Sequence, residues 1–128
     1  MKLSFRSLAI LSAILFFALA LVWMLAPNVA LSSWGVAFSP SAGLMSRRTA
    51  ALYAGLAVML FSARNSQPSP ARSAMVAGLV VACLTLAALG GFELITGHAG
   101  RGIVGAVIIE VAFLLAFVSV SHAREIRL

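Results

Sequence analysis

Residues 103–121 read IVGAVIIEVAFLLAFVSVS, a long apolar run in which Glu110 is the only charged residue. A run of this length can cross a bilayer, because about 20 apolar residues in a helix span the hydrocarbon core. A carboxylate near the middle of the membrane costs about 2.5 to 3.5 kcal/mol on insertion scales. We therefore expect a membrane-spanning helix here, with its Glu110 face turned away from lipid and towards other helices.

Three further apolar runs lie between charged or helix-breaking residues, and we expect each of them to cross the membrane. Residues 8–26 stop at Pro27, which ends helices readily, and residues 73–92 have full length. Residues 49–63 form only about 22 Å of helix at 1.5 Å per residue, but the arginines at both ends can reach the head groups. The sequence thus predicts an all-α fold, an integral membrane four-helix bundle that occupies residues 1–128 as a single domain.

The composition indicates that the lipid bilayer is the main partner of this chain. Of its 128 residues 62% are hydrophobic and 9% are charged, whereas globular proteins have about half apolar and about 25% charged residues. The net charge of +6 would suggest nucleic acid in a soluble protein. The basic residues flank the apolar runs instead, where they contact head groups, so we expect no nucleic-acid partner.

The basic residues also predict the orientation. With a cytoplasmic N-terminus, Arg47, Arg48 and Arg101 lie outside, and twice as many lie inside: Lys2, Arg6, Arg64, Arg72, Arg124 and Arg127. This bias places both termini in the cytoplasm, although the outer arginine pair leaves dual topology open. The first run resembles a signal peptide as well. It is longer than the usual apolar region of about 7 to 15 residues and lacks an A-x-A site, so we favour a retained helix.

Two connections on the predicted outer side have unusual compositions. Residues 28–48 carry much apolar surface, so we expect a loop that lies in the outer interface or folds over the mouth of the bundle. Residues 90–102 contain five glycines together with Glu93, His98 and Arg101. They predict a flexible hairpin in which Glu93 pairs with Arg101, or alternatively a nest of amides that binds an anion. No lysine follows the glycines as in a phosphate-binding P-loop.

Helical periodicity predicts which way Glu110 points. Gly102, Ala106 and Glu110 recur at steps of four, so they share a face with Phe113 and Phe117. Small residues on such a face allow another helix to approach closely. We therefore expect this helix to pack on the helix of residues 73–92, whose matching stripe consists of Ala74, Gly78, Ala82 and Thr85.

At the same membrane depth as Glu110 we expect Thr85, with Tyr53 also within reach. No lysine or arginine lies at that depth, so burial favours the neutral form of the carboxyl group. A neutral carboxyl could form an interhelical hydrogen bond that holds two helices together. Alternatively, Glu110 could be a proton or substrate site, because ionisable groups within membranes often mark such pathways.

The remaining residues predict no catalytic site, metal site or cofactor. No Ser-His-Asp arrangement, paired carboxylates or zinc-ligand spacing occurs, and the single cysteine, Cys83, excludes an intramolecular disulfide and a CxxC redox pair. Thiol-exchange chemistry is therefore not expected.

The segment Arg47-Arg48-Thr-Ala-Ala-Leu-Tyr53-Ala-Gly55-Leu, with Glu110 in the last run, resembles small four-span bacterial membrane proteins of the DoxX-like group. The resemblance implies a four-helix bundle in the bacterial cytoplasmic (inner) membrane and an accessory role in membrane redox chemistry or transport. It identifies no functional residue in this chain.

Three functional hypotheses follow. The first is a non-enzymatic structural or accessory bundle that forms a homo-oligomer or joins a larger membrane complex, as the small-residue faces suggest. The second is a small proton-coupled transporter that uses Glu110. The third is a membrane redox accessory or enzyme that uses the glycine-rich outer loop.

Overall fold

The computed structural model describes residues 4–125, with side chains described up to Ser121. Lys2, Arg127 and the side chain of Arg124, which contribute to the predicted orientation, lie outside the described residues. Within the described range all regular structure is helical, as predicted. The helices are α1 (Phe5–Leu25), α2 (Pro27–Ser33), α3 (Pro40–Ser62), α4 (Pro70–Thr96) and α5 (Ile103–Glu125).

Serine caps and prolines determine where two of the long helices begin. The hydroxyl of Ser39 accepts a hydrogen bond from the amide of Ala42 at the start of α3, and the hydroxyl of Ser69 accepts one from the amide of Arg72 at the start of α4. A proline follows each cap in the first turn, where its fixed φ suits a helix and its missing N–H costs nothing. The Ser-Pro dipeptides are therefore the start signals of α3 and α4.

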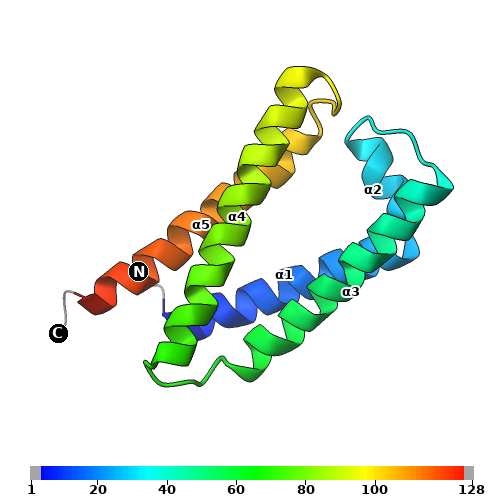
Figure 1. Cartoon of the computed structure of the whole chain (residues 1–128). Helices are drawn as coiled ribbons and strands as arrows, with labels where there is room; N and C mark the ends of the chain where they lie inside the picture. The colour runs from blue at the N-terminus through cyan, green and yellow to red at the C-terminus, as the bar shows by residue number, and fades with distance from the viewer. Residues whose placement is uncertain (1–3, 126–128) are drawn as a thin grey trace.

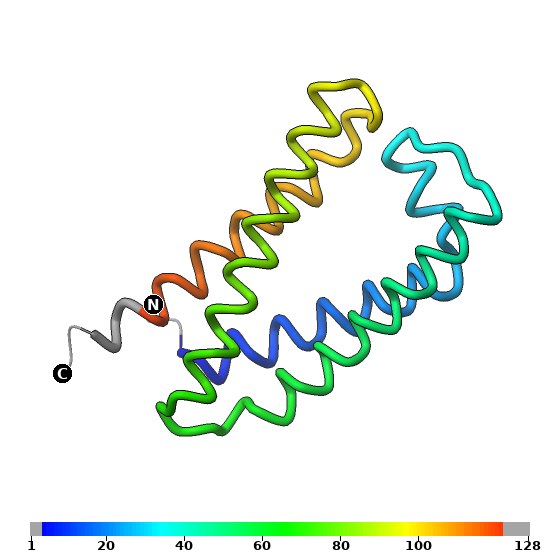
Figure 2. The backbone as a smooth tube through the Cα atoms, in the orientation of Figure 1, coloured from blue at the N-terminus to red at the C-terminus, as the bar shows by residue number. Residues whose placement is uncertain are grey.

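The four long helices form two hairpins. Helix α1 packs along α3, and α4 packs along α5 (Figure 1), so residues 103–121 pack on residues 73–92 as expected. The expected stripe does not make the close contact, since a Cβ atom on Gly78 would meet no atom within 4 Å, whereas one on Gly90 would meet Val107. The backbone trace shows that the hairpins meet at one end and diverge towards the other (Figure 2). Helices α3 and α4 are consecutive in the chain, but they do not pack along their length.

The converging ends of the hairpins enclose the main apolar core. Leu8 of α1, Leu60 of α3 and Phe117 of α5 are each at most 1% exposed and pack in one cluster with Leu79 of α4. At the same end, the guanidinium of Arg72 lies 3.9 Å from the centre of the Phe5 ring. All four long helices are therefore joined at this end.

The diverging ends are joined by two turns. The amide of Gly100, between α4 and α5, donates a hydrogen bond of 2.6 Å to the carbonyl oxygen of Trp34, after α2. A Cβ atom on Gly102 would overlap the carbonyl oxygen of Ser33, so only glycine permits this approach. The Trp34 ring also packs edge-on against Trp23 of α1, at 5.1 Å between ring centres.

Two predicted boundaries differ from the structure. Residues 28–48 are not a continuous loop, because they contain most of α2 and the first turns of α3. Helix α3 thus has 23 residues, about 34 Å at 1.5 Å per residue, rather than the expected 15. Charges at Arg47 and Arg48 end an apolar run but do not end a helix. Helix α4 likewise continues past residue 92 to Thr96, through Gly90, which packs closely on Val107.

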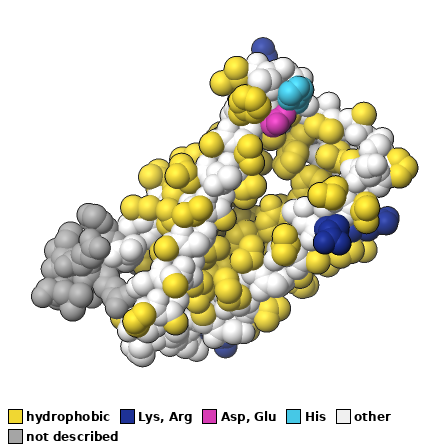
Figure 3. All heavy atoms as spheres, in the orientation of Figure 1, with side chains coloured by type: hydrophobic (Ala, Val, Ile, Leu, Met, Phe, Trp, Pro, Cys, Tyr) yellow, Lys and Arg dark blue, Asp and Glu magenta, His cyan; other side chains and the backbone are white. Residues whose placement is uncertain are grey.

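Three helices in the described part of the chain are long and apolar enough to cross a membrane: Phe5–Leu25, Pro70–Thr96 and Ile103–Ser121. Helix α3, with the polar residues of its first half, is not among them. Many large apolar side chains are exposed, including Leu25 at 77% and Ile95 at 87%, and apolar atoms dominate the face in Figure 3. The chain is a membrane protein by the length and composition of these helices.

Candidate functional site

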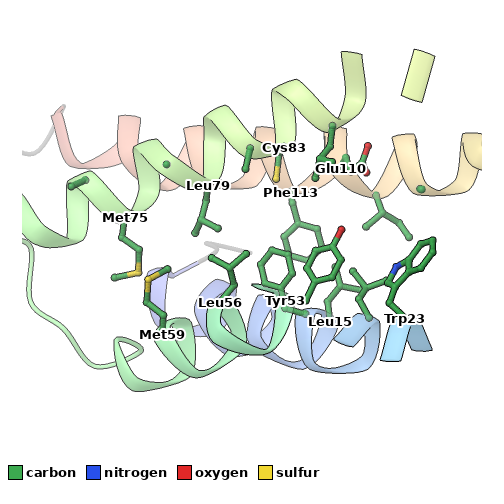
Figure 4. A pocket seen from close by; sticks show the side chains of 18 of the residues that line it. Leu15, Trp23, Tyr53, Leu56, Met59, Met75, Leu79, Cys83, Glu110 and Phe113 are labelled. Atoms are coloured by element: carbon green, nitrogen blue, oxygen red, sulfur yellow. The ribbon is translucent and has the colours of Figure 1, made fainter. Parts of the chain in front are cut away.

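A cavity of about 410 Å³ lies between the two hairpins, and all four long helices contribute to its walls. Figure 3 shows the hollow between the hairpins, and Figure 4 shows the side chains around it. Nearly all of the lining is aliphatic or aromatic. The lining residues that carry a polar or weakly polar side-chain atom are Trp23, Trp34, Tyr53, Met59, Met75, Cys83 and Glu110.

Glu110 is the only charged residue that lines the cavity. It lies on α5 on the same face as Ala106 and Phe113, as the helical periodicity predicts, and it is partly buried. Within the described part of the chain, its carboxyl group has no hydrogen bond or ion pair. The carboxyl group is therefore available to a molecule in the cavity.

Tyr53 approaches the same space from α3. Its ring stacks on Phe16 of α1, with 5.6 Å between centres and 20° between planes, and its hydroxyl points across the cavity towards the α4–α5 hairpin (Figure 4). Cys83 of α4 and Glu110 of α5 line the same cavity. The structure thus brings Tyr53 and Glu110, two of the predicted site residues, to one cavity.

Thr85 does not join them, and its predicted pairing with Glu110 is wrong. Its hydroxyl donates a 2.8 Å hydrogen bond to the carbonyl oxygen of Val81 in its own helix, and the residue is exposed. A threonine bonded to the preceding turn needs no interhelical partner. The stripe that begins with Ala74, Gly78 and Ala82 does line the cavity, but its next member is Leu86, four residues after Ala82.

The sequence does not predict that three aromatic side chains of the first hairpin and Cys83 line the cavity. Phe16, Trp23 and Trp34 reach the cavity from segments far from Glu110 in the chain. Cys83 directly follows Ala82 on α4 and also lines the cavity, although its sequence context predicts only the absence of a disulfide and of a redox pair. No local pattern signals these contributions, because they depend on how far apart the two hairpins lie.

The predicted outer-loop residues form a separate arrangement that does not line the cavity. Nδ1 of His98 lies 2.9 Å from the Glu93 carboxylate, so the predicted pairing of Glu93 with Arg101 is wrong. Gly97 adopts a left-handed conformation with φ of +81° after α4, a common way to end a helix. The amides of His98 and Ala99 consequently donate to the carbonyl oxygen of Glu93. This turn brings the His98 ring to the carboxylate of Glu93.

The cavity has the composition of a binding site for an apolar ligand. Among the described residues, no three His, Cys, Asp or Glu side chains are grouped so that they could hold a metal ion. One carboxyl group, one phenol and one thiol in an apolar chamber can orient a ligand through a single polar contact. Such a chamber matches ligand sites that are mostly apolar with a few placed polar groups.

Comparison with known proteins adds no identification, since no family model, curated protein or solved structure matches the chain.

Proposed function

We propose that this chain is a multi-pass protein of the bacterial cytoplasmic membrane that binds a lipophilic molecule between its two hairpins. In this proposal α1, α3, α4 and α5 cross the bilayer, and both termini are cytoplasmic. The role is non-enzymatic, that of an accessory protein that acts as a homo-oligomer or within a larger membrane complex. The cavity is the observation that carries the proposal.

The size and lining of the cavity support a small-molecule ligand. A volume of about 410 Å³ falls within the range of about 300 to 1,000 Å³ of known ligand sites. The cavity lies between the Phe117 core at one end and the Gly100–Trp34 contact at the other. A ligand could therefore occupy it while both ends of the molecule stay packed.

The gap between α3 and α4 supports entry from the membrane. These helices do not pack along their length (Figure 1), and the space-filling view shows a hollow between the hairpins (Figure 3). With about 34 Å of helix at 1.5 Å per residue, α3 is long enough to cross a hydrocarbon core of about 30 Å. If all four helices cross, this gap faces the acyl chains, which dissolve lipophilic molecules.

A fluorescence titration with Nile red tests the proposal on the full-length protein in neutral detergent. Gly78 lines the cavity, and a Cβ atom on it would meet no atom within 4 Å, so Gly78→Leu grows into the empty space. Gly55 has equal room but does not line the cavity, so Gly55→Leu is the matched control. We expect Gly78→Leu to abolish saturable binding and Gly55→Leu to preserve it. Equal binding by both variants would place the probe elsewhere and contradict the proposal.

Proton-coupled carriage is a second candidate, supported by the unbonded carboxyl group of Glu110. The test is pH equilibration in pyranine-loaded proteoliposomes under an imposed gradient, with and without added tetraphenylphosphonium. The cation also speeds equilibration in protein-free liposomes by compensating charge. Carriage therefore predicts an additional acceleration in the wild type, which Glu110→Gln, unable to exchange a proton, should lose. Equal rates of pH equilibration for the wild type and Glu110→Gln would contradict coupled transport and support binding alone.

A further inference from the structure

We propose that the ligand of the cavity is a monovalent lipophilic cation, with Glu110 as its counter-ion. This inference rests on the ligand-binding function proposed above and specifies the chemistry of the ligand. It depends on the charges, the aromatic rings and the shape of the cavity rather than on Glu110 alone.

The charge of the lining favours a cation over an anion. Glu110 is the only ionisable carboxyl among the lining residues, and none of the arginines that the structure describes lines the cavity. A carboxylate in an apolar space is unfavourable without a partner, because it loses its hydration. A bound cation restores the missing interaction, whereas a bound anion adds repulsion.

The aromatic rings provide a second, independent preference for a cation. Five rings line the cavity: Phe16, Trp23, Trp34, Tyr53 and Phe113. Ring faces attract cations within about 6 Å of the ring centre, and the attraction is larger where water is excluded. The stacked pair of Phe16 and Tyr53 and the edge-on pair of Trp23 and Trp34 flank the space from the α1–α3 side. Glu110 lies on the opposite side, on α5 (Figure 4).

The same residues argue against a hard divalent metal ion as the cation. Divalent ions such as Ca²⁺ and Mg²⁺ need about six or more oxygen ligands at short distance. The lining offers one carboxyl group and one phenol. An organic cation with a delocalised or shielded charge and apolar substituents fits both the single carboxylate and the greasy walls.

Isothermal titration calorimetry on the full-length protein in neutral detergent tests the proposal with two probes titrated separately. Tetraphenylphosphonium and tetraphenylborate have nearly the same size and shape but opposite charge. We expect the wild type to bind the phosphonium at least about tenfold more tightly than the borate, the ratio for one charge interaction of about 1.4 kcal/mol. Comparable affinities of the wild type for the two probes, or tighter borate binding, would overturn the inference, and no variant is needed for this result.

Two substitutions of Glu110 locate the origin of the preference. Glu110→Gln should lose the phosphonium preference, while Glu110→Asp keeps the charge and should retain most of it. Should Glu110→Gln not fold, the Asp variant and the wild-type ion ratio still decide the question. A Gln variant that binds the phosphonium as tightly as the wild type would assign the preference to another group and overturn the proposal.

The titration with Nile red separates this inference from the proposed function. If Nile red binds in a manner that Gly78→Leu blocks but tetraphenylphosphonium has no advantage, the cavity is a ligand site and only the cation assignment fails. If neither Nile red nor the phosphonium binds, the proposed function fails as well.

Discussion

The amide of Gly100 donates a 2.6 Å hydrogen bond to the carbonyl oxygen of Trp34 and thereby joins the two hairpins at their diverging ends. The two residues are far apart in the chain, and each lies in a turn rather than in a long helix. Gly102 lies against Ser33 in the same contact. The contact limits how far the hairpins separate, and thus bounds the cavity on this side.

A side chain at Gly102 should break this contact. Gly102→Ala places a Cβ atom on the Ser33 carbonyl, and steric overlap of this kind costs about 1 to 3 kcal/mol. We expect a lower free energy of unfolding in a titration with sodium dodecyl sulfate in mixed micelles, followed by tryptophan fluorescence. Gly105→Ala is the control, because a Cβ atom there meets nothing within 4 Å. Equal stability of the two variants would mean that the turns do not touch.

A second glycine tests the packing of α4 on α5. A Cβ atom on Gly90 would lie 2.6 Å from Cγ2 of Val107, so Gly90→Ala should destabilise the hairpin by about 1 to 3 kcal/mol. Val107→Ala removes the obstructing methyl group, and the double variant should recover much of the loss in the same titration. Gly91→Ala, with nothing within 4 Å of its Cβ atom, should cause no loss. Strictly additive effects of the first two substitutions would contradict this contact.

The converging core should depend on Phe117. Its side chain is 1% exposed, whereas that of Phe17 on α1 is 58% exposed. Truncating a buried phenylalanine to alanine costs about 3 to 5 kcal/mol in soluble proteins, so Phe117→Ala should destabilise the protein far more than Phe17→Ala does. Thermal unfolding monitored by circular dichroism compares the two. A similar loss for both would indicate that α5 does not pack at this end.

The interaction between His98 and Glu93 should affect only its surroundings and contribute little to stability. His98 and Glu93 are 69% and 39% exposed in their side chains, and exposed ion pairs contribute about 0 to 1 kcal/mol. Glu93→Gln should therefore shift the NMR resonances of the His98 ring while changing the stability little. Arg101→Gln should leave those resonances in place. The opposite pattern would restore the pairing of Glu93 with Arg101 that the sequence alone suggests.

The long helices and the direction in which Glu110 points can be predicted from the sequence. The apolar run from Ile103 predicts the start of α5, and the regular helical period correctly groups Ala106, Glu110 and Phe113. Both depend on local properties, namely hydrophobicity and the fixed rotation per residue. The apolar run begins only after Arg48 and so does not predict the start of α3 at Pro40, which the Ser39-Pro40 dipeptide indicates instead.

The cavity cannot be predicted from the sequence, for a different reason. Equal membrane depth predicts Thr85 as the partner of Glu110, but the Thr85 hydroxyl bonds to the Val81 carbonyl oxygen in its own helix instead. The space between the hairpins depends on packing between distant residues, such as the cluster that contains Leu8 and Phe117 and the hydrogen bond between Gly100 and Trp34. Periodicity along one helix carries no information about such distances.

The most direct test of the account is modification of Glu110 by dicyclohexylcarbodiimide, an apolar reagent that enters from lipid and reacts with carboxyl groups. The full-length protein in lipid nanodiscs is treated and digested, and the modified residue is identified by mass spectrometry. We predict modification at Glu110 that Gly78→Leu suppresses, because the new side chain projects into the cavity and leaves less room for the reagent, and that Gly55→Leu leaves unchanged. No modification of Glu110, or modification that Gly78→Leu does not reduce, would contradict a lipid-accessible cavity around this carboxyl group.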